Sequence, residues 1–140
     1  MKSVRPADRG SVTLWSLGLA VIVLALGVLS LDLWSVLAAR QELVAIADAT
    51  SFAAASGIDE ERLRADGSVI LDPEAARERA RVSLEGQDLP STWRGWEMTI
   101  ESDHVEVTVS GHVEGVLLPL IGFEGLDMTV TSRASPVLRS

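Results

Sequence analysis

Residues 8–34 read DRGSVTLWSLGLAVIVLALGVLSLDLW, and no charged side chain occurs between Ser11 and Leu31. As an α-helix these 21 residues would span about 31 Å, close to the roughly 30 Å hydrocarbon core of a bilayer. Trp15 and Trp34 would lie about 28 Å apart along that helix, so that one indole reaches each headgroup layer. The stretch therefore predicts a transmembrane helix. Its predicted membrane-interface anchors are Trp15, Asp32 and Trp34.

Charge is distributed unevenly on the two sides of this apolar run. Residues 1–10 carry three basic side chains against Asp8, whereas residues 32–140 contain 19 acidic residues and 9 arginines. The positive-inside rule then places residues 1–10 in the cytoplasm as a basic leader and the acidic body outside. Because an acidic body repels phosphates, nucleic acid is excluded as a partner. We predict a single-pass protein of the cytoplasmic (inner) membrane, with residues 11–31 in contact with lipid.

Two other interpretations of the apolar run remain open. A cleaved secretory signal has an apolar region of about 7 to 15 residues followed by a small-residue cleavage site. This run is longer, and the best cleavage site, after Ala38, lies beyond both Asp32 and Trp34. The second alternative is a buried helix of a soluble protein, which an uncharged run of this length disfavours.

The helix is predicted to continue beyond the membrane through residues 32–57, because no glycine or proline interrupts the chain before Gly57. This extension carries few charges and has no clean polar face, so its apolar surface needs cover. Its own domain can cover one side and neighbouring subunits the other. Alternatively, its many small alanine side chains leave little apolar area to hide. The candidate subunit contacts of the chain are Ser16, Ala20, Leu43, Ala47, Phe52, Leu117, Leu118, Ile121 and Phe123.

Residues 58–140 are predicted to form a small extracytoplasmic domain that begins with a polar linker and a helix. The linker, residues 59–72, should contain a short extended piece at residues 69–71. Asp72 and Pro73 are typical of the N-cap and first position of a helix, and this helix should end near Gly86.

The rest of this domain predicts an antiparallel sheet, because apolar and polar residues alternate in residues 96–101 and 105–113 and again from Leu126 to Val130. If Ser102-Asp103 forms a two-residue turn, the apolar residues of the first two strands all face the same side, although a longer loop remains open. The apolar residues 116–123 between the later strands either cap the core or form a contact patch. The predicted fold class is α+β: a long helix, a short helix and a small sheet.

Motifs for catalysis are not found in this sequence. It contains neither a glycine-rich phosphate loop nor a nucleophile motif, and without cysteine it has neither a disulfide nor a thiolate metal site. The tripeptide His-Val-Glu occurs twice, but on a strand its histidines, His104 and His112, would lie about 26 Å apart. A single His-x-Glu pair supplies too few ligands for a transition metal. We predict no catalytic residues, no cofactor and no metal site, and hence no enzyme.

The N-terminal part of the chain resembles TadE/TadG-like proteins of the Tad (tight adherence) Flp pilus-assembly system. The features that carry the resemblance are a basic tail ending in Arg9-Gly10, a small residue opening a long apolar run, an aspartate near its end, and the later segment ADATSFAAA. The similarity is most specific over residues 9–57. Similarity is looser in LDPEAARERA, VEVTVSGHV and MTVTSRA.

The resemblance implies a pilin-like protein that acts, through helix packing, as a minor subunit or assembly component of a Tad or type IV-type pilus. Its partners would be other pilus or pilus-assembly subunits and copies of itself, and it could be incorporated into a surface pilus. The resemblance also implies cleavage by a prepilin peptidase between Gly10 and Ser11. Type IV pilin relatives usually have a glutamate five residues into the mature chain that pairs with a neighbour's amino terminus. This sequence has Trp15 at that position, so the usual pairing is absent.

Two further function classes remain as alternatives. The first is a stand-alone membrane-anchored extracytoplasmic binding module, which the acidic domain and the apolar residues 116–123 would suit. In that case residues 58–140 should fold and bind alone. The second is an exported enzyme whose site is assembled across loops.

Overall fold

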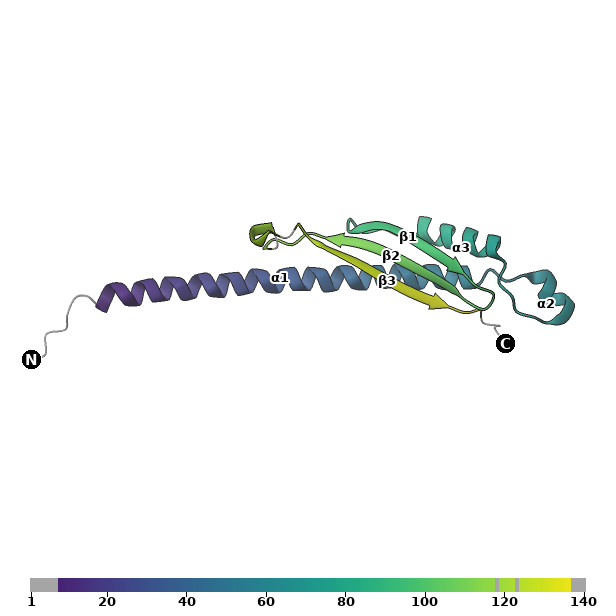
Figure 1. The fold of residues 1–140 in the computed structure, drawn as a ribbon, viewed down its shortest axis with the longest axis horizontal. Helices are drawn as coiled ribbons and strands as arrows, with labels where there is room; N and C mark the ends of the chain where they lie inside the picture. Colours follow the sequence, from purple (N-terminus) through teal and green to yellow (C-terminus); the bar gives the residue numbers. More distant parts are fainter. Residues whose placement is uncertain (1–7, 118, 123, 137–140) are drawn as a thin grey trace, which may run out of the picture.

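A computed structural model describes residues 8–117, 119–122 and 124–136, and Figure 1 shows a long helix with a small sheet domain packed along its second half. The predicted α+β arrangement is confirmed. In chain order the elements are helix α1 (Asp8–Ala55), helix α2 (Glu60–Asp66), helix α3 (Pro73–Glu85), strand β1 (Trp93–Ile100), strand β2 (Val105–Val113), the 3-10 turn η1 (Pro119–Ile121) and strand β3 (Leu126–Ala134).

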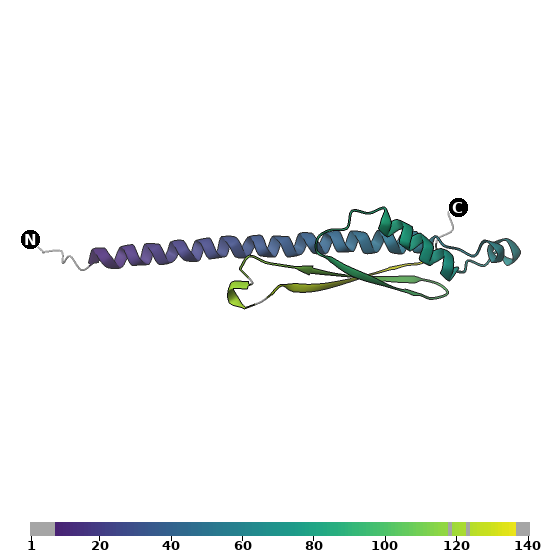
Figure 2. The ribbon, with the colours of Figure 1, turned by 90° about the horizontal axis from the view of Figure 1, so that it is seen from above.

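Helix α1 is one continuous element of 48 residues, as the absence of helix breakers after the apolar run predicts. It begins at Asp8, three residues before the predicted start. In Figure 2 the sheet lies on one side of its second half, while no described helix or strand packs along most of the first half. The side chains from Val12 to Leu31 are accordingly exposed around the helix, apart from a half-buried Val28.

Residues 59–72 differ from the predicted polar linker, because they contain α2. The Asp59 carboxylate caps this helix by accepting two backbone N–H groups of the first turn at 3.1 Å each. Gly67 ends it in the left-handed conformation, with φ of 75°, which glycine adopts without steric cost. The predicted extended piece is reduced to a single bridge between Ile58 and Leu71.

Helix α3 has the predicted start and end. The Asp72 carboxylate accepts the N–H groups of the first turn at 2.9 and 3.3 Å, Pro73 is the first helical residue, and Gly86 is the C-cap. Its buried residues recur every fourth position, so they form one stripe facing the core. They are Ala76, Ala80 and Leu84.

The sheet has the order β1-β2-β3, with both pairs antiparallel. The register predicted for the first hairpin is confirmed, since Ile100 lies opposite Val105 and the later pairs follow in step. Strand β2 alternates between buried and half-buried residues, and Val105, Val107 and Val109 belong to the core. At Gly111 a Cβ would lie 2.6 Å from Leu43 Cδ1, so the missing side chain lets α1 approach the sheet closely.

One hydrophobic core joins α1, α3 and the sheet. The predicted helical extension of residues 32–57 is therefore packed on one side against described residues of the predicted domain 58–140. The buried core residues are Leu43, Ile46, Ala47, Ala54, Leu71, Ala76, Ala80, Leu84, Val105, Val107 and Val109.

Candidate membrane and subunit contact surfaces

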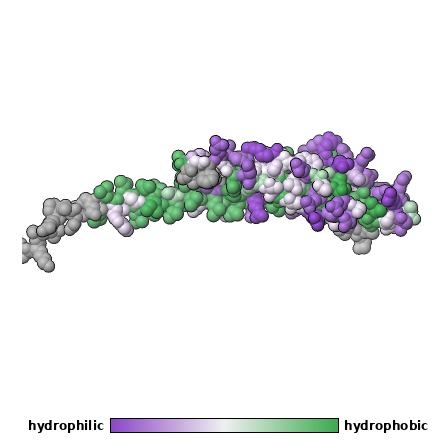
Figure 3. Space-filling model, in the orientation of Figure 1, coloured by the Kyte–Doolittle hydropathy of each residue, from purple (hydrophilic) through white to green (hydrophobic). Residues whose placement is uncertain are grey.

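The first half of α1 presents apolar side chains in every direction. Figure 3 shows hydrophobic residues covering this half, whereas hydrophilic residues dominate the far end of the molecule. Within the described residues one helix is long and apolar enough to cross a membrane, at Val12–Ala55. Trp15 and Trp34 are both exposed, so each indole is free to reach an interface. This half of α1 fits a membrane protein.

The hydroxyls of Ser16 and Ser30 in this half are satisfied within the helix. Ser16 Oγ donates to the carbonyl oxygen of Val12 at 2.9 Å, and Ser30 Oγ donates to that of Leu26 at 2.8 Å. A hydroxyl bonded to its own helix can face hydrocarbon without an unmet polar group. Ser16 and Ala20 are exposed, so their role as a small-residue subunit contact stays a prediction.

Asp32 has a contact that the sequence does not reveal. Its side chain is 5% exposed, and its two oxygens accept the backbone N–H groups of Val116 and Leu117 at 2.8 and 2.9 Å. Hydrogen bonding to both oxygens offsets the cost of burying this carboxylate. Asp32 thus joins α1 to the β2–β3 loop. Its role as a membrane-interface anchor stays a prediction. The Asp32 carboxylate itself is bound by the protein's own backbone.

The predicted contact patch at residues 116–123 is described in part. Leu117 is half-buried beside Asp32, whereas the neighbouring Leu120 side chain is 78% exposed. For Ile121 the structure gives only its backbone, within η1. Leu118 and Phe123 lie outside the described residues, so their predicted contacts are not tested.

Two predicted subunit contacts are corrected by the packing of the second half of α1. Leu43 and Ala47 are fully buried in the protein's own core, so they are not available to a second subunit. The predicted contact Phe52, by contrast, is 70% exposed. We define the outer face of α1 as the exposed residues that follow Phe52's side of the helix. They are Trp34, Leu37, Gln41, Ala45 and Phe52.

The outer face of α1 is shallowly hollowed and bordered by charge. Leu37, Gln41 and Ala45 line the hollow together with Arg40 and Asp48. Asp48 is engaged on its β3 side, where its Oδ1 accepts the hydroxyl of Ser132 at 2.6 Å. A mostly apolar strip with charges at its borders is a surface that a second helix can cover.

The predicted cleavage position lies within helix α1. Gly10 and Ser11 both follow its first residue, Asp8, so the bond between them is in helical backbone. A peptidase that binds extended chains would have to unwind this first turn. Cleavage there stays a prediction.

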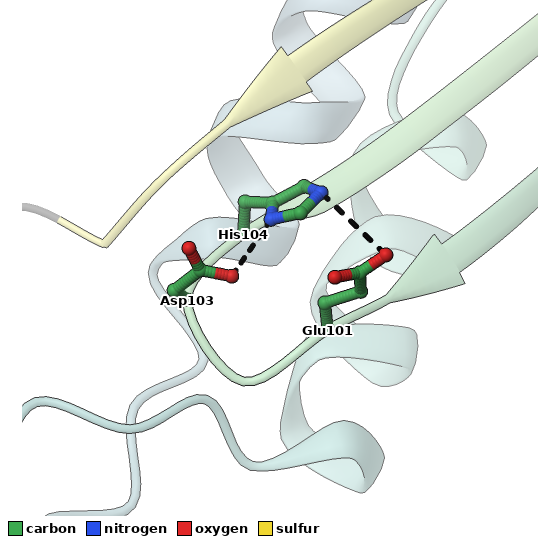
Figure 4. Close-up of side chains that lie close together, drawn as sticks. All are labelled: Glu101, Asp103 and His104. Atoms are coloured by element: carbon green, nitrogen blue, oxygen red, sulfur yellow. Dashed lines mark hydrogen bonds and ion pairs between the residues drawn. The ribbon is translucent and has the colours of Figure 1, made fainter.

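The β1–β2 turn brings three titratable groups together, and Figure 4 shows the ring of His104 between the carboxylates of Asp103 and Glu101. His104 Nδ1 lies 2.8 Å from Asp103 Oδ1, and Nε2 lies 4.0 Å from Glu101 Oε1. The hydrogen bond with His104 holds the pKa of Asp103 below its ordinary value. The possible ligand atoms lie within 4.8 Å of one another, but exposed acidic groups commonly cluster without a metal. The absence of a metal site stays a prediction.

The second histidine lies far from this turn, as expected. His112 Nδ1 is 2.6 Å from Asp127 Oδ1 of β3, across the other strand pair.

On α3, Arg81 bonds both Glu78 and Glu85 at 2.9 Å. The hydrogen bond with Arg81 lowers the pKa of Glu78. These exposed pairs are typical of a solvated surface.

The comparison with protein families found a similarity for the part of the chain that forms α1. Residues 10–57 match the model of the Tad family, described as "Putative Flp pilus-assembly TadE/G-like". The predicted resemblance is confirmed. The matched segment covers nearly all of α1 and includes both of its halves, the exposed one and the one packed on the sheet. A search of curated proteins and a search of solved structures each gave no match to the chain.

The Tad-like segment indicates a protein related to Flp pilus assembly, with a structural or assembly role and other pilus components as its interaction partners. The family model ends at Gly57 and therefore does not cover α3 or the sheet. These elements are nevertheless packed on the matched helix through one core.

Proposed function

We propose that this protein is a single-pass, pilin-like membrane protein that acts as a minor subunit or assembly component of a Tad or type IV-type pilus. Its N-terminus lies in the cytoplasm, α1 crosses the inner membrane, and the sheet domain lies outside. Its function is contact with other subunits through α1. The observation that carries the proposal is that a Tad-like helix is exposed and apolar in its first half and keeps an apolar outer face in its second half.

The two faces of the second half of α1 support this proposal. The inner face carries the fully buried Leu43 and Ala47, so the sheet domain satisfies that side. The outer face keeps Leu37 and Phe52 exposed. Exposed apolar strips on a helix are typical of interaction surfaces. A neighbouring α1 would cover this strip outside the membrane and the apolar first half within it.

Cysteine crosslinking along α1 tests the proposal, and the chain contains no native cysteine to interfere. Ala45→Cys on the outer face and Ala47→Cys in the core form a matched pair, because the same substitution is made two residues apart. In native membranes we expect Ala45→Cys and Phe52→Cys to crosslink to another copy or to a pilus component, and Ala47→Cys to remain monomeric. Monomers at all three positions would refute contact through the outer face.

Intact mass distinguishes a fibre subunit from an anchored assembly factor. Protein extracted from membranes should begin at Ser11 only when the host's prepilin peptidase is present, if it is a processed subunit despite Trp15. A full-length chain in both strains would identify a permanently anchored assembly component. Cleavage near Ala38 would contradict the membrane anchor, and it would also remove Asp32 from its contact with the β2–β3 loop.

The alternative of a stand-alone binding module has one structural feature in its favour. Two shallow, open pockets that share Arg81 and Trp96 lie between α3 and β1, and their lining is apolar apart from Arg77, Arg81 and Glu85. The shared core argues against independence of the domain, because residues 58–140 alone would lack Leu43, Ile46 and Ala47. The lining residues include Trp93, Trp96, Met98, Leu84 and Leu89.

A further inference from the structure

The β2–β3 loop is fixed at the outer end of the apolar run of α1. Asp32 is the first charged residue after that run, and its carboxylate binds the N–H groups of Val116 and Leu117. The beginning of the loop therefore lies at the level where the membrane span ends. From there η1 extends past the ends of the strands toward the first half of α1, as both Figure 1 and Figure 2 show.

The chemistry of this loop suits a lipid surface. Residues 115–123 contain no charged side chain, and the flanking residues Glu114 and Glu124 mark its limits. Val116 is 69% exposed and Leu120 is 78% exposed. Leu29 and Leu31, in the turn of α1 that precedes Asp32, are exposed as well.

The backbone of the loop is also prepared for a water-poor environment. Asp32 accepts two of its N–H groups, and two more, those of Leu120 and Gly122, donate to carbonyl oxygens within the loop at 3.0 and 3.2 Å. Pro119 has no N–H group to satisfy. Water becomes scarcer toward the hydrocarbon core, so an irregular segment enters the membrane interface at lower cost when its polar backbone groups already have partners in the protein. The N–H groups of Val116, Leu117, Leu120 and Gly122 thus meet this condition.

We propose that the β2–β3 loop is a second membrane-contacting element, in which Val116 and Leu120 enter the interfacial layer of the outer leaflet and Asp32 holds the loop in place. The inference rests on the proposed crossing of the membrane by α1. Together the helix and the loop would fix the tilt of the sheet domain on the lipid surface, because two separate contacts define an orientation that one helix leaves free.

Single-cysteine fluorescence quenching in lipid vesicles tests this contact. The full chain, carrying Val116→Cys or Leu120→Cys with an environment-sensitive dye, is reconstituted in phosphatidylcholine vesicles at a low protein-to-lipid ratio. Val82→Cys is the matched control, because Val82 is 56% exposed and belongs to α3, which lies at the other end of the domain from the β2–β3 loop (Figure 1). Leu24→Cys reports on the span itself. Quenchers are a lipid with a nitroxide near its headgroup and aqueous iodide.

We expect the nitroxide lipid to quench the dye at residues 116 and 120 several-fold more strongly than at Val82, and iodide to show the reverse order. Equal quenching at Leu120 and Val82, with strong lipid quenching at Leu24, would overturn the loop contact while the span survives. If the nitroxide lipid quenches the dye at neither residue 120 nor residue 24, both the membrane span and the loop contact are overturned. If protection of the dye at residue 120 from iodide increases with the protein-to-lipid ratio, the loop contacts a second subunit instead of lipid. That result would overturn the proposal.

The positioning role of Asp32 has its own readout. Asp32→Ala should reduce lipid quenching at Leu120 to the level of Val82, because the loop loses its attachment to α1. Quenching at Leu24 should be unchanged, because the first half of α1 stays in the membrane. Asp32→Asn keeps one acceptor oxygen and should give an intermediate value. Unchanged quenching at Leu120 in a folded Asp32→Ala variant would refute this role.

Discussion

The two halves of α1 belong to one continuous α-helix but differ in their surroundings. From Val12 to Leu31 the side chains are exposed apart from the half-buried Val28, whereas from Asp32 to Ala55 one face is buried against the sheet and α3. Both halves are rich in apolar residues. The same secondary structure therefore meets two kinds of apolar environment, and the change occurs at Asp32, where the β2–β3 loop is attached.

The largest effect should come from separating the two halves of the structure. A fragment of residues 58–140 loses the α1 side of the core and should be unfolded, with poor dispersion in its amide NMR spectrum. A fragment of residues 32–140 keeps that side and should give a dispersed spectrum. A native-like spectrum from residues 58–140 alone would restore the stand-alone module as a serious alternative.

Truncation of a single core side chain should have the next largest effect. Leu43→Ala leaves a cavity beneath Gly111 and should lower the free energy of unfolding by about 3–5 kcal/mol. The control is Leu37→Ala on the outer face, which should change it by less than about 0.5 kcal/mol. Thermal unfolding of the full chain in detergent measures both. Equal losses would mean that the inner and outer faces are wrongly assigned.

A charge in the first half of α1 should impair membrane insertion. Ile22→Arg places a cation near the middle of the span and should cost about 2.5–3.5 kcal/mol of insertion free energy. Ala45→Arg, on the exposed outer face beyond the span, should have no such effect. Resistance of the protein to alkaline extraction from membranes compares the two. Full resistance of Ile22→Arg would indicate that this half lies outside the hydrocarbon.

The smallest effect should follow from loss of the attachment between the halves. Asp32→Ala leaves two backbone N–H groups without their acceptors and should lower stability by about 1–3 kcal/mol. Asp48→Ala removes an acceptor from one hydroxyl, that of Ser132, and should cost less. Thermal unfolding in detergent again gives the comparison. An equal or larger loss for Asp48→Ala would contradict the importance of the loop attachment.

Features set by neighbouring residues could be predicted from the sequence. The unbroken length of α1 follows from the absence of proline and of glycine after the apolar run, and the start of α3 follows from Asp72-Pro73. The hairpin register follows from alternation, because a shift of one residue would turn the apolar side chains of β1 away from Val105 and its neighbours. In these cases the local chemistry and the fold agree.

Features set by distant partners could not be predicted. The polar composition of α2 suggested a linker, although its cap Asp59 and its end Gly67 define a helix of only seven residues. Leu43 packs against the sheet because Gly111 leaves room for it. An alanine-rich helix without a polar face does not reveal which of its sides faces the sheet. The contact of Asp32 with Val116 joins positions far apart in the chain, and an aspartate at the end of an apolar run does not reveal it.

The shared core also sets an order of events during synthesis. Leu43 is synthesised before Val105, which shares its core, and before Gly111, against which it packs. A nascent chain that has not yet delivered β2 therefore carries an uncovered apolar strip on α1, which makes it prone to aggregation or to recognition by a chaperone. Once β2 and β3 are complete, they cover these apolar side chains of α1. The N–H groups of the loop between them can then bind the Asp32 carboxylate.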